Sequence, residues 1–145
     1  MNYDQIIHLD AEELAEQGIL SAYKNLLPML KTYVSCPFDV TEEMDNEAAQ
    51  YFVFAGGRRY EIWEENAKNN DGWERAMVAF FQIVNANLCT SPYKFYALYD
   101  DNDLSGIFFT GKEFDAACKA MAKPSDRPWL PVEKPPCCLV RNSIY

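Results

Sequence analysis

The sequence has few of the residues that enzymes use for nucleophilic or phosphate chemistry. It contains one histidine, His8, and neither a phosphate-binding loop nor a CxxC cysteine pair among its 145 residues. A serine or cysteine nucleophile activated by histidine would have to use His8, which lies in an N-terminal segment where chains often fray. We therefore interpret His8 as a surface or strand-edge residue, and we do not expect an enzyme.

The sequence also lacks signals for membranes and for export. No apolar run reaches the roughly 20 residues that cross a bilayer, and residues 1–8 have neither a basic region nor a long apolar core. The 5 cysteines are odd in number and widely spaced, which argues against disulfides in a chain without an export signal. Cys118 reads as a small core residue, whereas Cys137 and Cys138 have no second pair nearby to complete a metal site. We expect a cytoplasmic protein without a cofactor.

Acidic charge is the most prominent feature that is present. Aspartate and glutamate number 22 against 13 lysines and arginines, which sets the formal net charge at -9. Residues 39–74 hold ten of the acidic residues and only three of the basic ones. Such a distribution repels nucleic acid and anionic lipid and attracts basic proteins. The pattern favours a binding protein with a basic partner, although net charge by itself also promotes solubility.

Three segments have the periodicity and the start signals of helices. Apolar residues recur at steps of three and four in residues 11–34, 72–88 and 111–122. Each segment begins with a capping side chain followed three residues later by glutamate, which is the pattern of a capping box. The capping residues are Asp10, Asp71 and Thr110. Pro28 lies inside the first segment and predicts a kink or a break there.

Two pairs of strands alternate with these helices. Residues 51–55 and 58–63 flank Gly56-Gly57, which is a strong signal for a tight hairpin, and residues 93–99 and 104–109 form the second pair. The order α-β-β-α-β-β-α predicts an α+β fold with three main helices. We expect an antiparallel sheet of about four strands with the helices on one face.

The chain is short enough to be one domain, and its C-terminal part differs in composition. Residues 124–145 contain five prolines, which prevent regular structure. We expect a single α+β domain over residues 1–123, followed by an extended tail that Trp129 and Leu130 pin to it.

Three further patterns have alternative interpretations. Adjacent carboxylates such as Glu42-Glu43 suit a hydrolase only where two of them converge in a cleft. Residues 101–106 resemble the start of a calcium loop, but Lys112 stands where the loop needs glutamate, so we favour a hairpin turn. The run Gly56-Gly57-Arg58-Arg59 has no helix after it and is also interpreted as a turn.

A set of short segments lies between residues 72 and 131. The segments are Gly72-Trp73-Glu74-Arg75-Ala76, Ile83-Val84-Asn85, Phe95-Tyr96-Ala97-Leu98, residues 102–110 and Arg127-Pro128-Trp129-Leu130-Pro131. Together they resemble immunity proteins of bacterial polymorphic toxin systems, including contact-dependent inhibition and Neisseria-type toxin–immunity pairs. The resemblance implies a small cytoplasmic protein that binds one cognate toxin domain, in many cases a nuclease with a basic cleft. It assigns no residue a fixed role, and Asp100-Asp101 departs from the glycine-rich turn of the family.

These observations predict an immunity protein that neutralises a nuclease toxin by occluding its basic cleft, with aromatic anchors adding affinity. The expected binding residues are Glu42, Glu43, Asp45, Glu47, Tyr51, Tyr60, Glu61, Trp63, Glu64 and Glu65. A second group comprises Asp100, Asp101 and Asp103. The alternatives are a small enzyme that uses a carboxylate pair and an oligomeric scaffold, such as a homodimer bridged by the tail.

Overall fold

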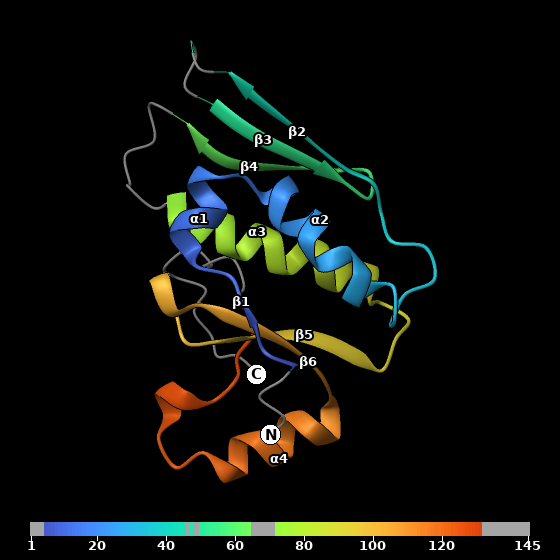
Figure 1. Ribbon diagram of the computed structural model, residues 1–145, viewed down its shortest axis with the longest axis vertical. Helices are drawn as coiled ribbons and strands as arrows, with labels where there is room; N and C mark the ends of the chain where they lie inside the picture. The colour runs from blue at the N-terminus through green and yellow to red at the C-terminus, as the bar shows by residue number, and fades with distance from the viewer. Residues whose placement is uncertain (1–4, 46, 48–49, 65–71, 132–145) are drawn as a thin grey trace, which may run out of the picture.

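The computed structural model describes residues 5–45, 47, 50–64 and 72–131 (Figure 1). The helices are α1 (Ala11–Glu16), α2 (Ile19–Leu30), α3 (Gly72–Asn87) and α4 (Gly111–Ala120), with short 3-10 helices η2 (Asp101–Asp103) and η3 (Pro124–Asp126). The strands are β1 (Ile7–His8), β2 (Val40–Asp45), β3 (Gln50–Ala55), β4 (Arg58–Glu64), β5 (Tyr93–Leu98) and β6 (Ser105–Thr110). Helices and antiparallel sheets alternate along the chain, so the predicted α+β class is confirmed.

The strands form two sheets of three, in the orders β2-β3-β4 and β1-β6-β5. Figure 1 shows the first sheet at the top, then a layer made of α1, α2 and α3, then the second sheet, and α4 at the bottom. Both predicted hairpins are present, but the helix layer lies between them. The arrangement therefore differs from the expected single sheet of about four strands with helices on one face, because each hairpin gains a third strand and buries its inner face against the same helices.

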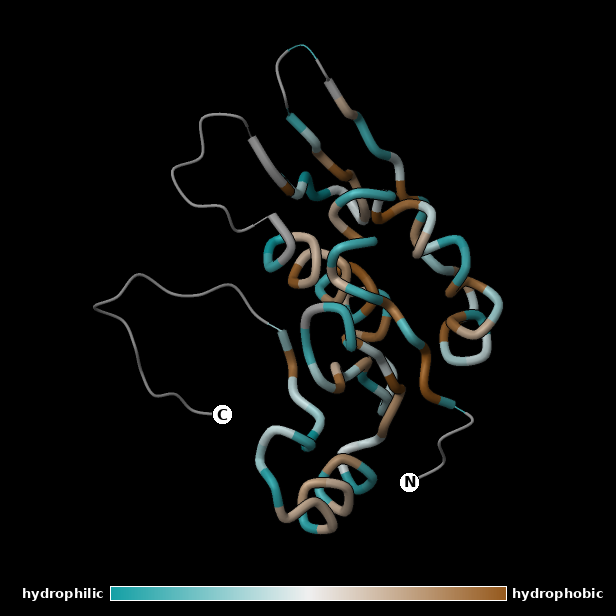
Figure 2. Tube along the Cα trace, turned by 60° about the vertical axis from the view of Figure 1, so that its left-hand side comes forward, coloured by the Kyte–Doolittle hydropathy of each residue, from teal (hydrophilic) through white to brown (hydrophobic). Residues whose placement is uncertain are grey.

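The main hydrophobic core fills the space between the two sheets. It joins residues of α1, α2 and α3 to the inner faces of the strands, including Tyr51, Val53 and Phe95. A second, smaller cluster lies between the outer face of β5 and β6 and α4, where the Tyr96 ring stacks on Phe114 with centroids 4.4 Å apart. Hydrophobic segments are correspondingly concentrated towards the middle of the molecule (Figure 2).

The predicted break in the first helical segment falls at a different residue. The helix is interrupted at Gly18, whose φ of 102° ends α1 and precedes α2. Pro28 lies within α2, two residues before its end at Leu30, so the expected break there is wrong. A positive φ cannot be part of a right-handed helix and suits glycine, whereas a proline near a C-terminus removes only one hydrogen bond.

Local sequence signals at other positions are confirmed. The amide of Glu113 donates to Thr110 Oγ1 at 3.2 Å and the amide of Thr110 donates to Glu113 Oε1 at 2.9 Å, which completes a capping box at α4. Asp10 accepts from the amides of Glu12 and Glu13 at the start of α1. The cap predicted at Asp71 lies outside the described residues.

The β3–β4 hairpin turns through Gly56 and Gly57, with φ angles of 57° and 80°. Both angles fall in the region that a tight primed turn requires, so the predicted turn is confirmed. The Phe38 ring covers this turn, and a Cβ on Gly56 would lie 2.8 Å from Phe38 Cε2. Glycine is therefore needed at position 56 for space as well as for conformation.

Two separate sets of hydrogen bonds close the free edge of β5. Asn85 on α3 donates from Nδ2 to the Phe95 carbonyl at 3.0 Å and accepts the Phe95 amide on Oδ1 at 2.7 Å. Two residues along, the backbone groups of Ala97 and Trp129 exchange hydrogen bonds of 2.7 and 2.9 Å. These contacts satisfy the outward-facing groups of an edge strand, and they hold the chain at Trp129 against the domain. The tail beyond Pro131, including Cys137 and Cys138, lies outside the described residues.

Candidate functional site

The acidic residues of the first half are carried by the two edge strands of the β2-β3-β4 sheet. Cross-strand pairing places Glu43 opposite Phe52 and Phe52 opposite Glu61, so the two glutamates flank one aromatic ring in a single row. Adjacent strands are about 4.8 Å apart, which puts the backbones of Glu43 and Glu61 roughly 10 Å from each other. Both residues are exposed. The sheet therefore brings together acidic residues that are 18 positions apart in the sequence.

The neighbouring rows extend this surface. One row contains Thr41, Phe54 and Arg59, and another pairs the backbones of Asp45, Gln50 and Glu64. We define the outer sheet face by its described side chains: Thr41, Glu43, Phe52, Phe54, Arg59 and Glu61. In the part of the chain that the structure describes, no helix covers this face (Figure 1).

The structure describes the side chains of only some of the acidic residues near this face. Glu47 is exposed beside the end of β2. The side chains of Asp45 and Glu64 and the whole of Glu65 lie outside the described residues. Register therefore places the backbones of Asp45 and Glu64 at the same end of the sheet as Glu47, and the binding role of these residues stays a prediction.

The Phe52 ring and Glu61 already have cationic partners within the protein. The Arg59 guanidinium carbon lies 3.8 Å from the centroid of the Phe52 ring, a cation–π distance. Glu61 forms an ion pair with Arg75 on α3 at 3.8 Å, and both side chains are about 40% exposed. At such exposure the pair contributes about 0–1 kcal/mol, because water screens it. The Phe52 ring and the Glu61 carboxylate thus already interact with guanidinium groups of the protein itself.

Glu42 has a structural role on the opposite face of the same strand. Its Oε2 accepts from the Tyr51 hydroxyl at 3.2 Å, and that hydroxyl accepts from the Ile19 amide at 2.7 Å, in the first turn of α2. A Cβ on Gly18 would lie 3.1 Å from both carboxylate oxygens of Glu42. Gly18 has no side chain to cap α2, so Tyr51 and Glu42 cap it from the sheet, where the positive helix end favours a carboxylate.

The expected aromatic anchors Tyr51 and Tyr60 are not on the surface, and this part of the prediction is wrong. Tyr51 is 0% exposed and Tyr60 is 7% exposed, because both face the helix layer. Burial raises the pKa of the Tyr51 hydroxyl far above its ordinary value, and the charge of Glu42 adds to the shift. The aromatics that point to the outer sheet face are Phe52, which is only 9% exposed beneath Arg59, and Phe54, which is half-buried. The side chain of Trp63 lies outside the described residues.

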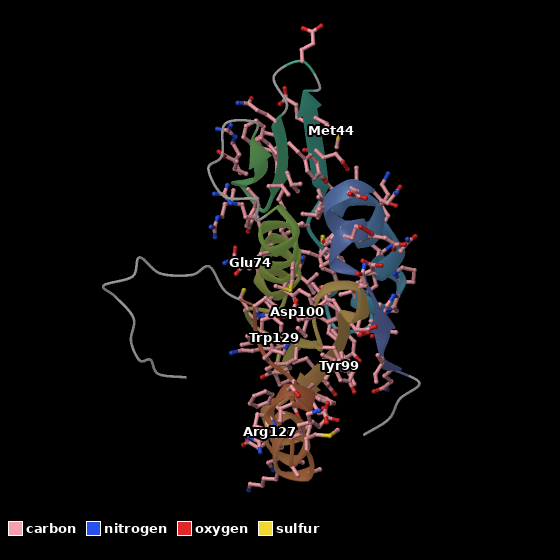
Figure 3. All side chains as sticks on the ribbon, turned by 90° about the vertical axis from the view of Figure 1, so that its left-hand side faces the viewer. Met44, Glu74, Tyr99, Asp100, Arg127 and Trp129 are labelled. Carbon is pink, nitrogen blue, oxygen red and sulfur yellow. The ribbon has the colours of Figure 1, made fainter. Side chains whose placement is uncertain are left out.

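The second acidic group lies on the other sheet. Asp100 and Asp103 are exposed in the connection between β5 and β6, and the side chain of Asp101 lies outside the described residues. Asn102 in the same connection donates to Asp10 Oδ1 at 3.0 Å. Figure 3 shows Met44 on β2 near one end of the molecule and Asp100 well below it. The two acidic groups predicted from the sequence are therefore separate surfaces.

On sequence alone, His8 and the calcium-like loop of residues 101–106 are candidate chemical sites. His8 lies on β1 and lines a small cavity of about 140 Å³ between β1, α1 and α2. Among residues 5–45, 47, 50–64 and 72–131, no group of three or more His, Cys, Asp or Glu side chains is arranged to hold a metal ion. His8 is an exposed residue of β1, and Asp101–Asp103 form the 3-10 turn η2 between β5 and β6; the side chain of Asp101 lies outside the described residues.

A larger cavity, of about 460 Å³, lies where β5 ends and the proline-rich segment begins. Its lining residues define what we call the Tyr99 cavity: Tyr99, Asp100, Pro124, Ser125, Asp126, Arg127, Pro128 and Trp129. Sequence reasoning identified Trp129 as a residue that pins the tail, but it missed Tyr99. Tyr99 has a φ of 60°, which costs a non-glycine residue about 1–2 kcal/mol. That backbone conformation has no signal in the sequence.

Comparisons with known proteins add no relatives: no family model, no curated protein and no solved structure matches this chain. None of the helices in the described part of the chain is both long enough and apolar enough to span a membrane. The functional conclusion therefore rests on the surfaces of the protein itself.

Proposed function

We propose that this protein is a binding protein whose outer sheet face takes a basic protein partner, and that it acts as an immunity protein. In this role it neutralises a cognate nuclease toxin by occupying the basic cleft that would hold phosphates. The observation that supports the proposal is the row Glu43–Phe52–Glu61 on a sheet face that no described helix covers. The mechanism is occlusion, and it requires no chemical step.

The chemistry of the face supports a partner rich in arginine or lysine. Arg59 already covers the Phe52 ring, which is 9% exposed, so a partner's basic groups would meet the carboxylates of Glu43 and Glu61 rather than the ring. Acidic side chains steer a basic partner and raise the association rate, an effect that weakens as salt increases. Charged residues on an edge strand also discourage unwanted strand pairing, so solubility is the competing explanation for Glu43.

The size of the face limits how the partner binds. Six-residue strands are about 20 Å long, and three of them span about 10 Å between the outer backbones. The resulting area of roughly 200–300 Å² is well below the roughly 800 Å² that each partner buries in a stable interface. The interface must therefore extend beyond the sheet, and Glu47 beside the end of β2 lies in a position to join it.

The test uses the product of the neighbouring gene as the partner. Cells expressing that product are scored for survival with and without this protein, and the affinity of the purified pair is measured at low and high salt. The Glu43→Lys/Glu61→Lys variant is expected to lose protection and to bind at least tenfold more weakly, a change of about 1.4 kcal/mol. The matched control is Glu16→Lys/Asp115→Lys, which makes the same charge change at exposed positions on α1 and α4.

Equal loss in both variants would show that net charge rather than the outer sheet face governs binding. Unchanged affinity and salt dependence in the Glu43→Lys/Glu61→Lys variant would remove the face from the interface. A neighbouring gene product that does not harm cells would overturn the immunity role itself.

A further inference from the structure

The β2 strand forms the free edge of its sheet. All 6 residues of β2 pair with β3 without a shift in register, and no described strand lies on its other side. Figure 1 shows β2 at the outer border of the top sheet. In the part of the chain that the structure describes, no backbone hydrogen bond reaches this outer side. The free edge of β2 is therefore a regular row of backbone groups to which another strand can be added.

The other sheet edges are closed or interrupted. Asn85 and the backbone of Trp129 bond to the edge of β5. On the outer side of β6, β1 pairs with the first two residues, and the Thr110 amide at the other end is used in the capping box of α4. β4 carries a bulge, because Glu61 and Trp63 are opposite successive residues of β3. Covering segments and bulges prevent strand addition, so β2 is the edge that stays regular among the strands that the structure describes.

The tight turn between β3 and β4 determines which backbone groups of β2 face outwards. Such a turn makes its flanking residues, Ala55 and Arg58, a hydrogen-bonded pair, and bonded and non-bonded pairs alternate along antiparallel strands. Residues of β3 that bond to β4 therefore alternate with residues that bond to β2, and the latter include the partners of Thr41 and Glu43. The remaining residues of β2 turn their N–H and C=O groups to the free edge. They are Val40, Glu42 and Met44.

The charge of β2 admits one kind of strand and opposes another. If a second copy of this chain were added antiparallel over the centre of β2, Glu42 would lie opposite Glu42 or Glu43 opposite Glu43. Like charges directly opposite each other destabilise a sheet. The Glu43 side chain is exposed on the outer sheet face, so a strand with lysine or arginine opposite it gains an attractive pair instead. The charge that opposes self-pairing therefore selects a basic segment.

Met44 indicates what the other face of an added strand requires. It is paired with Tyr51, so it lies on the sheet face that packs on the helix layer, yet 43% of it is exposed. Figure 3 shows Met44 on β2, near one end of the molecule. Because side chains of a strand alternate between the two faces, basic residues opposite Glu43 would alternate with apolar residues beside Met44. The edge thus favours a segment in which basic and apolar residues alternate.

We propose that the free edge of β2 binds an extended basic segment of the partner protein as a fourth strand of the sheet. In this segment, lysine or arginine alternates with apolar residues. The proposal rests on the proposed function for the basic protein partner, and it adds the form in which that partner binds. Main-chain hydrogen bonds to β2 supply affinity and the alternating side chains supply specificity. Strand addition also extends the interface beyond the outer sheet face, which is too small by itself.

The probe is the peptide acetyl-Lys-Val-Lys-Val-Lys-Val-amide, added at saturation to the isotope-labelled full-length protein. Hydrogen exchange of single amides is followed by NMR. Slower exchange is expected at the outward amides of Val40, Glu42 and Met44, whereas Thr41 and Glu43, whose amides face β3, should change little. This alternation is the signature of strand addition, because binding through side chains on the outer sheet face has no reason to follow it.

Two altered peptides test the charge and the backbone separately. Replacing the lysines by glutamates is expected to weaken binding at least tenfold, a change of about 1.4 kcal/mol, because glutamate would then lie opposite Glu43. Methylating the valine amides keeps every side chain but removes the donors that face β2, and it is expected to abolish the alternating protection. This second peptide leaves the protein unchanged, so its result does not depend on how a variant folds.

Two variants at one position make the same distinction within the protein. Met44→Pro removes an outward N–H without removing a bond to β3, as proline is tolerated on an edge strand, so it is expected to fold and to lose the peptide response. Met44→Ala is the matched control, because it removes the side chain but keeps the N–H, and it should weaken the response less. Unchanged amide shifts in β5 and β6 verify that Met44→Pro is folded.

Three outcomes would overturn strand addition. These are equal binding of the lysine and glutamate peptides, equal protection at inward and outward amides of β2, and an unchanged response to the methylated peptide. Protection of the outward amides that grows with protein concentration without peptide would overturn the basic occupant in favour of a second copy.

The immunity role can fail separately. A neighbouring gene product that does not harm cells overturns that role and leaves the peptide result as it is. A protective complex in which the amides of Val40, Glu42 and Met44 exchange as fast as in the free protein overturns strand addition and leaves the role.

Discussion

The two three-stranded sheets of this protein are built alike and used differently. The β1-β6-β5 sheet lies between the helix layer and α4, and its β5 edge is closed by Asn85 and Trp129. The β2-β3-β4 sheet packs on the helix layer with one face, and its other face carries Glu43, Glu61 and Arg59. A sheet buried on both faces serves stability, whereas a sheet with one open face has side chains available for a partner. We therefore expect substitutions in the two sheets to have effects of very different size on folding.

The largest effect is expected at Gly106 in the enclosed sheet. A Cβ at Gly106 would lie 2.2 Å from Phe95 Cζ. The Phe95 ring is fully buried, and its centroid lies 4.8 Å from that of Phe81 and 4.6 Å from that of Phe108. Because the ring has no room to move, Gly106→Ala is expected to lower the free energy of unfolding by about 3 kcal/mol, the upper range for overpacking. Urea denaturation measures this loss.

Gly57→Ala in the open sheet provides the contrast for Gly106→Ala. Among the residues that the structure describes, and apart from its chain neighbours, no atom lies within 4 Å of a Cβ at Gly57. Only the φ of 80° opposes alanine, so the expected loss is about 1–2 kcal/mol. Equal losses at the two glycines would contradict the difference in packing between the sheets.

The next largest effect is expected from opening the edge of the enclosed sheet. Asn85→Ala removes both hydrogen bonds to the Phe95 backbone, leaving two polar groups at a strand edge without their partners. The expected loss is about 2–3 kcal/mol in urea denaturation. Faster hydrogen exchange at the Phe95 amide should accompany it, and unchanged exchange would show that another group protects this edge. Asn85→Asp keeps an acceptor for the amide but places a carboxylate oxygen against the Phe95 carbonyl, so it should not restore the lost stability.

The cap of α2 is the point at which the open sheet does contribute to stability. Tyr51→Phe leaves the buried Ile19 amide unpaired and should lower the unfolding free energy by about 1–2 kcal/mol at neutral pH. Because the pKa of Tyr51 is raised on folding, the native state keeps a proton that the unfolded state releases above pH about 10. Stability should therefore fall as pH rises beyond about 10, by at most about 1.4 kcal/mol per pH unit for this group.

Measuring unfolding free energy from about pH 8 to about pH 11 for the native protein and for Tyr51→Phe checks this dependence. Burial also raises the pKa values of Tyr23, Tyr33 and Tyr96, so part of the alkaline loss should remain in the variant. If the unfolding free energy fell equally steeply with pH in both proteins, Tyr51 would contribute nothing to the alkaline loss.

The smallest effect on stability is expected on the outer sheet face. Glu43→Ala should change the unfolding free energy by less than about 0.5 kcal/mol, the usual range for exposed positions away from special contacts. Any effect of this substitution should appear in partner binding and its salt dependence instead. A loss in thermal denaturation as large as that of Asn85→Ala would mean that this face is structural and would remove the contrast between the sheets.

Features that depend on a few neighbouring residues were predictable from the sequence. The capping box of Thr110 and Glu113 and the turn at Gly56 and Gly57 were both identified, because each needs only residues within three positions of one another. The apolar period located α3 and α4 for the same reason. The interruption at Gly18 was not predicted. The helix that follows it is capped by the Tyr51 hydroxyl, which accepts from the Ile19 amide 32 positions away in the sequence.

The amino-acid sequence by itself determined the α+β class, the two hairpins, the positions of α3 and α4 and the charge of the first half. Only the tertiary structure decided that the hairpins belong to two sheets, that Tyr51 and Glu42 turn inwards, and that Tyr99 meets Trp129 beside a cavity. Both faces of β3 are apolar in sequence, so composition cannot say which face meets the helices. The pairing with the neighbouring strands decides it. Val53 is paired with Tyr60, whereas Phe52 is paired with Glu43 and Glu61, so turning Tyr51 and Val53 inwards buries apolar side chains of both strands and leaves the charged ones in water.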